Sequence, residues 1–83
     1  MDKRTIKIVC FAGLRKYFGS ETSVDVEPEV SYSSVIDALI LQNPEANEIL
    51  NSSRIAVNEV FVKLSDKLKA DSTLFLIPPS SGG

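Results

Sequence analysis

The sequence contains no histidine, and this absence narrows the chemistry that the chain can perform by itself. Histidine is the commonest general base near neutral pH and the commonest metal ligand. Cysteine occurs once, as Cys10, which excludes an internal disulfide and any cysteine-rich metal or iron–sulfur site. We therefore expect no metal site, no independent catalytic site and a reducing, cytoplasmic location.

Long runs of one kind of residue are also missing. The chain has 9 basic and 11 acidic residues, a net charge of −2, and no long block of either sign. Binding to nucleic acid would require a basic stripe, and a membrane-spanning helix needs about 18 consecutive apolar residues. We expect neither a nucleic-acid partner nor a membrane association. Residues 1–4 lead directly into a strand-like pattern, so we also expect no signal peptide.

What the chain does have is enough apolar material for one modest core. It contains 83 residues, of which 43% are hydrophobic. A single domain of this size buries roughly 60–65% of its unfolded surface, which leaves no room for a large internal substrate pocket. We expect the domain to span residues 1–77. Cys10 lies in an apolar alternating run, and we interpret it as a buried small hydrophobe rather than a reactive thiol.

Several stretches have the composition of β-strands. Residues 5–11 alternate in part, and residues 22–27 alternate cleanly with Val24 and Val26 facing inward. Residues 54–57 and 60–62 are separated by Asn58-Glu59, which tolerates a turn. Residues 73–77 are apolar on both faces, which indicates a strand in the middle of a sheet. In the first strand, one face would carry Ile6, Ile8 and Cys10 and the other Lys7, Val9 and Phe11.

One amphipathic helix is clear. Ser31 is a suitable N-cap residue, and Asn43-Pro44 ends the pattern because the residue before proline avoids helical geometry. The helix would bury one broad stripe formed by Tyr32, Val35, Ile36, Leu39 and Ile40. Shorter helical turns are expected at residues 14–18, ended by Gly19, and at residues 46–50.

The resulting order is strand, strand, helix, strand, short strand, strand. If the last strand is central and pairs with the first, the helix crosses one face of a mixed sheet. The pattern therefore predicts an α+β fold of the β-grasp type. A small ferredoxin-like sandwich is the alternative, although that fold normally needs two full helices.

The end of the chain has an unusual composition. Pro78-Pro79 can neither continue a helix nor donate to a sheet ladder, and four small residues follow. We expect residues 78–83 to form an extended, flexible tail that presents the carboxylate of Gly83. From Pro79 to Gly83 the tail would reach roughly 15–18 Å, at about 3.3–3.6 Å per residue. A frayed end or a purification scar with the same composition is the alternative interpretation.

Motifs along the whole chain resemble one family. They are Phe11-Ala12 with Leu14-Arg15, Ala56-Val57-Asn58, Leu68, and Ile77-Pro78-Pro79 before Ser81-Gly82-Gly83. In this order and spacing, the chain resembles the small, sulfur-carrying subunit of molybdopterin synthase, a member of the ubiquitin-like β-grasp proteins. It departs from that family at Ser80, where a branched apolar residue is usual, and at Asp71-Ser72-Thr73, where Gly-Asp-Glu is usual.

The resemblance implies a sulfurtransferase subunit that works only with partners. An activating enzyme would use ATP to adenylate Gly83, and a sulfur donor would convert the adenylate to a thiocarboxylate. The tail would then enter the large subunit of the synthase, within a heterotetramer. There it would donate sulfur to cyclic pyranopterin monophosphate and form the dithiolene of molybdopterin. The chain itself would bind no cofactor.

The same resemblance assigns roles to residues. Gly82 and Gly83 would form the reactive end, and partner contacts would come from Pro78, Pro79, Ser80, Ser81, Phe11, Phe75 and Ile77. The sheet face away from the helix would carry Val9 and Phe11 with either the Phe75/Ile77 pair or the Leu74/Leu76 pair. Two alternatives stay open. One is a related carrier for thiamin synthesis or tRNA thiolation, and the other is a ubiquitin-like modifier that joins Gly83 to lysines.

Overall fold

The computed structural model describes residues 3–69 and 73–79. The five strands are β1 (Arg4–Cys10), β2 (Glu21–Val26), β3 (Arg54–Val57), β4 (Val60–Phe61) and β5 (Leu74–Ile77). The α-helices are α1 (Arg15–Phe18), α2 (Tyr32–Gln42) and α3 (Asn47–Asn51), and single 3₁₀ turns precede α1 and α3 at Ala12–Leu14 and Pro44–Ala46. None of the helices in these ranges is long and apolar enough to cross a bilayer.

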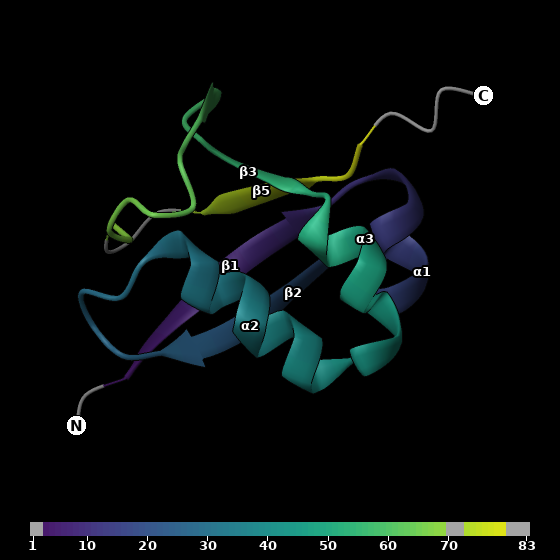
Figure 1. Cartoon of the computed structure of the whole chain (residues 1–83), viewed down its shortest axis with the longest axis horizontal. Helices are drawn as coiled ribbons and strands as arrows, with labels where there is room; N and C mark the ends of the chain where they lie inside the picture. Colours follow the sequence, from purple (N-terminus) through teal and green to yellow (C-terminus); the bar gives the residue numbers. More distant parts are fainter. Residues whose placement is uncertain (1–2, 70–72, 80–83) are drawn as a thin grey trace.

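The strands form one mixed sheet in the order β2-β1-β5-β3-β4. The first and last strands pair in parallel, and the other pairs are antiparallel. This confirms the β-grasp prediction, with β5 central and α2 as the main helix across one face (Figure 1). The helices α1 and α3 have 4 and 5 residues, so the second full helix of a ferredoxin-like sandwich is absent from the described residues.

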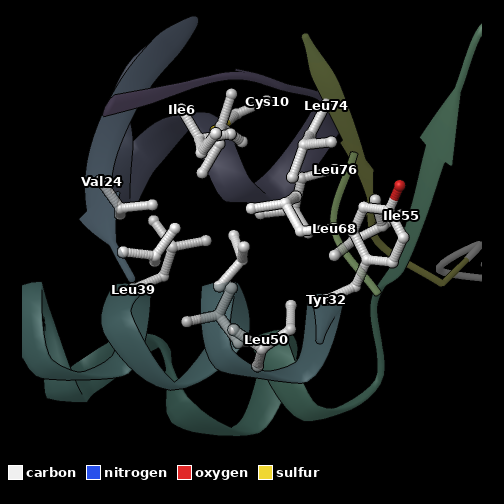
Figure 2. Close-up of a cluster of buried hydrophobic side chains, with 14 of the residues drawn as sticks. Ile6, Cys10, Val24, Tyr32, Leu39, Leu50, Ile55, Leu68, Leu74 and Leu76 are labelled. Atoms are coloured by element: carbon white, nitrogen blue, oxygen red, sulfur yellow. The ribbon is translucent and has the colours of Figure 1, made fainter. Parts of the chain in front are cut away.

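The core lies between the sheet and the helices α2 and α3. Figure 2 shows Ile6, Cys10, Leu74 and Leu76 pointing from the strands toward the helices. From the opposite side, Leu39 of α2 and Leu50 of α3 project toward them and are fully buried. The stripe predicted for α2 is confirmed by the burial of Tyr32, Val35, Ile36 and Leu39, whereas Ile40 is only partly buried.

The start of α2 differs from the sequence-based expectation in one respect. Ser31 is the N-cap residue, but its side chain makes no capping hydrogen bond. Its Oγ instead lies 2.6 Å from Oγ of Ser33. The amides of Tyr32 and Ser33 donate to the carbonyls of Asp66 and Leu64, at 3.0 and 2.9 Å. A distant loop therefore satisfies two of the amides that have no partner within the helix at its N-terminus.

The turns follow the predicted residue types. Gly19 ends α1 with φ +78°, a backbone region that favours glycine. Asn58 and Glu59 both have positive φ, 51° and 68°, as the two central residues of a tight hairpin turn require. Leu68 is buried, and its amide donates to the carbonyl of Val30 at 2.7 Å. Asp71 and Ser72, where the sequence departs from the family it resembles, lie outside the described residues.

Replacement of Ile36 by alanine should destabilise the fold. Ile36 is 4% exposed, so the change leaves a cavity in the core and should cost about 2–5 kcal/mol in the free energy of unfolding. Leu41 lies on the same helix but is 83% exposed. Leu41→Ala should change stability by no more than about 0.5 kcal/mol. Urea unfolding of both variants tests this, and equal losses would contradict the assigned core.

Cys10 should react slowly with thiol reagents in the folded protein. Burial raises the pKa of the Cys10 thiol above its ordinary value of 9.0, and the nearby Arg15 cation offsets part of this effect. Because only the unfolded thiol ionises readily, stability should fall as the pH rises above about 9. A chromogenic disulfide at pH 8 should label Cys10 far faster in guanidinium than in buffer. Equally fast labelling in both would show that the thiol is accessible.

Candidate functional site

The sheet face opposite the helices is partly open, and its register defines which residues it carries. Val9 lies beside Phe75, Phe75 beside Ala56, and Ala56 beside Phe61. Residues directly opposite one another in adjacent strands point to the same face. These four side chains therefore form a row across β1, β5, β3 and β4, which we call the apolar row. Phe61 is 54% exposed within it.

The open face contains the Phe75/Ile77 pair. Leu74 and Leu76 are buried on the helix side, whereas Phe75 and Ile77 are only partly buried. Phe11 lies beside the row, where its ring meets that of Phe75 edge to face at 6.0 Å and 80°. Aromatic pairs favour this arrangement. Three residues expected to contact partners, namely Phe11, Phe75 and Ile77, thus belong to one surface.

Beside Phe11, the first two residues of the tail, Pro78 and Pro79, border a hollow of about 620 Å³. We call these two residues the root of the tail. The lining of the hollow consists of Phe11, Ala12, Gly13, Ile49, Ile77, Pro78 and Pro79. The hollow is therefore almost wholly apolar and joins the chain end to the loop after β1. It brings together four of the predicted contact residues: Phe11, Ile77, Pro78 and Pro79. Ser80, Ser81, Gly82 and Gly83 lie outside the described residues.

The loop after β1 has a strained and crowded backbone. Ala12 has φ +52°, and a non-glycine residue in this region costs about 1–2 kcal/mol. A Cβ placed on Gly13 would lie 3.3 Å from Cδ1 of Ile49, which also lines the hollow. Arg15 Nε donates to the carbonyl of Cys10 at 3.3 Å and ties the following helix to the end of β1. The conformation of this loop is therefore set by its packing around the hollow.

The other half of the open face is polar. Lys7 forms a salt bridge to Glu21 at 3.4 Å, and Thr5 Oγ1 donates to Oδ1 of Asp25 at 2.6 Å. Both contacts join β1 to the edge strand β2 and are exposed to solvent. Such pairs contribute little to stability. They give the open face a polar side next to its apolar row.

Sequence reasoning missed two residues at the far side of the row, Arg54 and Phe61. The guanidinium carbon of Arg54 lies 5.2 Å from the centre of the Phe61 ring, within cation–π distance. Arg54 also stands opposite Ile77, the last residue before the two prolines. The hairpin turn at Asn58-Glu59 was the available clue, because it fixes the register that places Phe61 beside Ala56.

Around the first residues of the tail, the described part of the chain forms surfaces suited to contact. Within residues 3–69 and 73–79, no three His, Cys, Asp or Glu side chains gather in a way that could hold a metal ion. Cys10, the thiol in this part of the chain, is buried, and this burial raises the pKa of the thiol. What the arrangement can do is bind an apolar partner surface and hold Pro78 and Pro79 at the rim of a hollow.

Solved structures from archaea share this fold. Small archaeal modifier protein 1 of Haloferax volcanii is 24% identical, with 95% of this chain and 99% of that chain covered and a TM-score of 0.79. A Pyrococcus furiosus protein with the provisional name molybdopterin converting factor, subunit 1 is 20% identical, with coverages of 93% and 99% and a TM-score of 0.79. Caldiarchaeum subterraneum ubiquitin is 22% identical, with coverages of 99% and 100% and a TM-score of 0.69.

The family assignment comes from the sequence itself. The model of the ThiS family matches residues 8–83, from the middle of β1 through Gly82-Gly83. This range includes the apolar row, the hollow and the root of the tail. The chain therefore belongs to the ThiS family of ubiquitin-like sulfur carriers.

Proposed function

We propose that the chain is the sulfur-donating small subunit of molybdopterin synthase, with Gly83 as the group that is activated. The observation that carries this proposal is the way the central strand ends. Ile77 leads directly into Pro78-Pro79 at the rim of the apolar hollow, and the sequence continues to Gly82-Gly83. The tail is thus anchored to the strand that the rest of the sheet surrounds.

The proposed chemistry takes place at the terminal carboxyl group. An oxygen of the Gly83 carboxylate attacks the α-phosphorus of ATP and releases pyrophosphate. Sulfide sulfur then attacks the acyl carbon, AMP leaves with its electron pair, and a thiocarboxylate remains. Making the mixed anhydride divides one difficult substitution into two easier ones. The ATP and the sulfur are supplied by partner enzymes.

The residues of the tail suit this role. A side chain at Gly83 would crowd the acyl carbon, and a Cβ at Gly82 would restrict the backbone inside a narrow channel. Pro78 and Pro79 fix their own φ angles. They therefore reduce the entropy that is lost when a partner orders the tail.

The body of the domain would serve as the docking element. The apolar row and Phe11 offer partly exposed aromatic surface next to the root of the tail, and aromatic side chains are enriched at protein interfaces. The acid–base and cationic groups for the pterin chemistry would lie on the large subunit, in which the tail would be inserted.

A ubiquitin-like modifier is the second candidate, favoured by the likeness to small archaeal modifier protein 1. A modifier would use the same adenylated Gly83 but transfer its acyl carbon to a lysine amine. A stable complex with a larger subunit, measured by size-exclusion chromatography with light scattering, would support the synthase. Conjugates of increasing mass in cell extract would support the modifier instead.

Incubation with a cognate activating enzyme, ATP and a sulfide source should raise the intact mass by about 16 Da, because one carboxylate oxygen is exchanged for sulfur. Mass spectrometry of the whole chain measures this. Omission of ATP is the control. If the mass does not increase with a cognate activator, the sulfur-carrier proposal is wrong.

Addition of one residue after Gly83 should abolish the mass increase and cofactor synthesis while leaving the fold intact. The reacting carboxyl group would then no longer lie at Gly83, and a side chain would stand beside it. Circular dichroism checks the fold of the extended protein. Cofactor synthesis at the normal rate by that protein would contradict the proposed role of the terminal carboxylate.

Replacement of Phe61 by serine should weaken the complex with the activating enzyme or the large subunit by about tenfold or more, because it removes exposed aromatic surface from the apolar row. Leu41→Ser is the matched control, since Leu41 is 83% exposed on α2, away from this face. Calorimetric titration measures both variants. Equal affinities of the two variants would exclude the open face as the docking surface.

A further inference from the structure

A second groove continues the apolar row around the free side of the β3–β4 hairpin. It has a volume of about 430 Å³ and lies where the chain passes from α3 into β3 and out of β4. Its lining consists of Asn51, Ser52, Ser53, Arg54, Phe61, Val62, Lys63 and Leu64. Phe61 belongs to both surfaces and Arg54 lies over its ring, so a partner seated on the apolar row would also reach this groove.

The charge of this groove is of one sign. Its lining contains two cations, Arg54 and Lys63, and no carboxylate. The ion pairs between described residues are Lys7–Glu21 and Lys67–Glu29, and neither involves these two side chains. Two acidic residues, Glu59 and Asp66, lie two positions from this lining along the chain, and Oδ2 of Asp66 accepts from the backbone amide of Lys63 at 3.4 Å. The chain has a net charge of −2, so this positive groove contrasts with the whole molecule.

The groove also has apolar walls. Phe61 is 54% exposed and Leu64 is 37% exposed, while Val62 is packed against the core. The position of Arg54 over the Phe61 ring restrains its guanidinium. A stacked guanidinium keeps its N–H edges available for a bidentate contact with a carboxylate. The groove therefore combines a fixed cation, a second cation and exposed apolar surface.

We propose that this groove binds an acidic peptide segment with an apolar side chain, presented by a protein that takes up the tail. That this protein is an enzyme acting on Gly83 follows from the proposed function. That its segment is acidic and apolar follows from the residues that line the groove. A carboxylate of the segment pairs with Arg54, and its apolar side chain packs on Phe61 and Leu64. Because Arg54 stands opposite Ile77, the segment sits beside the point where the tail leaves the sheet.

The groove suits an acidic peptide better than a free phosphate or a nucleotide. Phosphate sites are typically built from converging backbone amides at a helix N-terminus or a glycine-rich loop. This groove lies instead at the C-terminal end of α3, and it contains no glycine. Exposed apolar walls next to cations match a chain that alternates carboxylates with aliphatic or aromatic side chains.

The test is titration of the isotope-labelled full chain with a short synthetic peptide that alternates Glu and Leu, followed by amide NMR. The expected result is saturable shifts at Arg54, Phe61, Lys63 and Leu64 that weaken with added salt. A peptide with Gln in place of Glu should bind at least about tenfold more weakly, a difference of about 1.4 kcal/mol. The Arg54→Gln, Lys63→Gln double variant should likewise bind the acidic peptide at least about tenfold more weakly than the unchanged chain does.

The matched control is the Lys3→Gln, Lys67→Gln double variant, which removes the same charge from residues outside the groove. It should keep the affinity within about twofold. Equal binding of the Gln peptide, shifts centred elsewhere, or equally strong shifts with AMP or inorganic phosphate at these residues would each overturn the proposal. Because the titration uses neither ATP nor an enzyme, its outcome is independent of whether Gly83 acquires sulfur.

Discussion

The parallel pairing of β1 with β5 is the interaction on which the rest of the structure depends. It buries Ile8 beside Leu74 and Cys10 beside Leu76 under the helices. It also joins the first strand of the described chain to the last one. The tail root therefore emerges from the most enclosed strand of the sheet. Because such strands open only with global unfolding, the domain gives the tail a fixed origin.

The two faces of the sheet differ: one packs against the helices and stabilises the fold, and the other is partly open to solvent. Under the helices, β1 and β5 contribute five side chains that are almost fully buried: Ile6, Ile8, Cys10, Leu74 and Leu76. On the open side, the same strands contribute Val9, Phe75 and Ile77, which are only partly covered. The polar contacts between β1 and β2 end the apolar surface on one side, and Arg54 adds a cation beside Phe61 on the other. A partner complementary to both the apolar and the charged region would be held in one orientation, because complementary charge and apolar surface fix the register of an interface.

In the proposed function, the chain contributes no acid, base or metal of its own, which agrees with its lack of histidine. Its contributions would be a small, unhindered carboxyl terminus and a surface that holds the tail at a partner's channel. Activation, sulfur supply and substrate binding would all lie on other proteins. A small core is sufficient for such a role, since the domain only has to keep one surface and one strand end in place.

The sequence alone determined where most strands and the main helix lie, because the signals for them are local. These signals are the alternation of apolar and polar residues in the strands, the i, i+3, i+4 stripe of the helix, and Pro44 after its end. The sequence also made β5 central, since residues 74–77 are all apolar. Because all four residues are apolar, the sequence left open which pair faces outward, and only the register with β1 placed Phe75 and Ile77 on the open side.

Tertiary structure also supplied the carbonyls of Leu64 and Asp66, which accept hydrogen bonds from the first amides of α2 in place of a Ser31 side-chain cap. It also placed Ile49 at the tail root and Arg54 over Phe61. Contacts between residues far apart in the chain depend on how the strands align, and local patterns carry no information about that alignment.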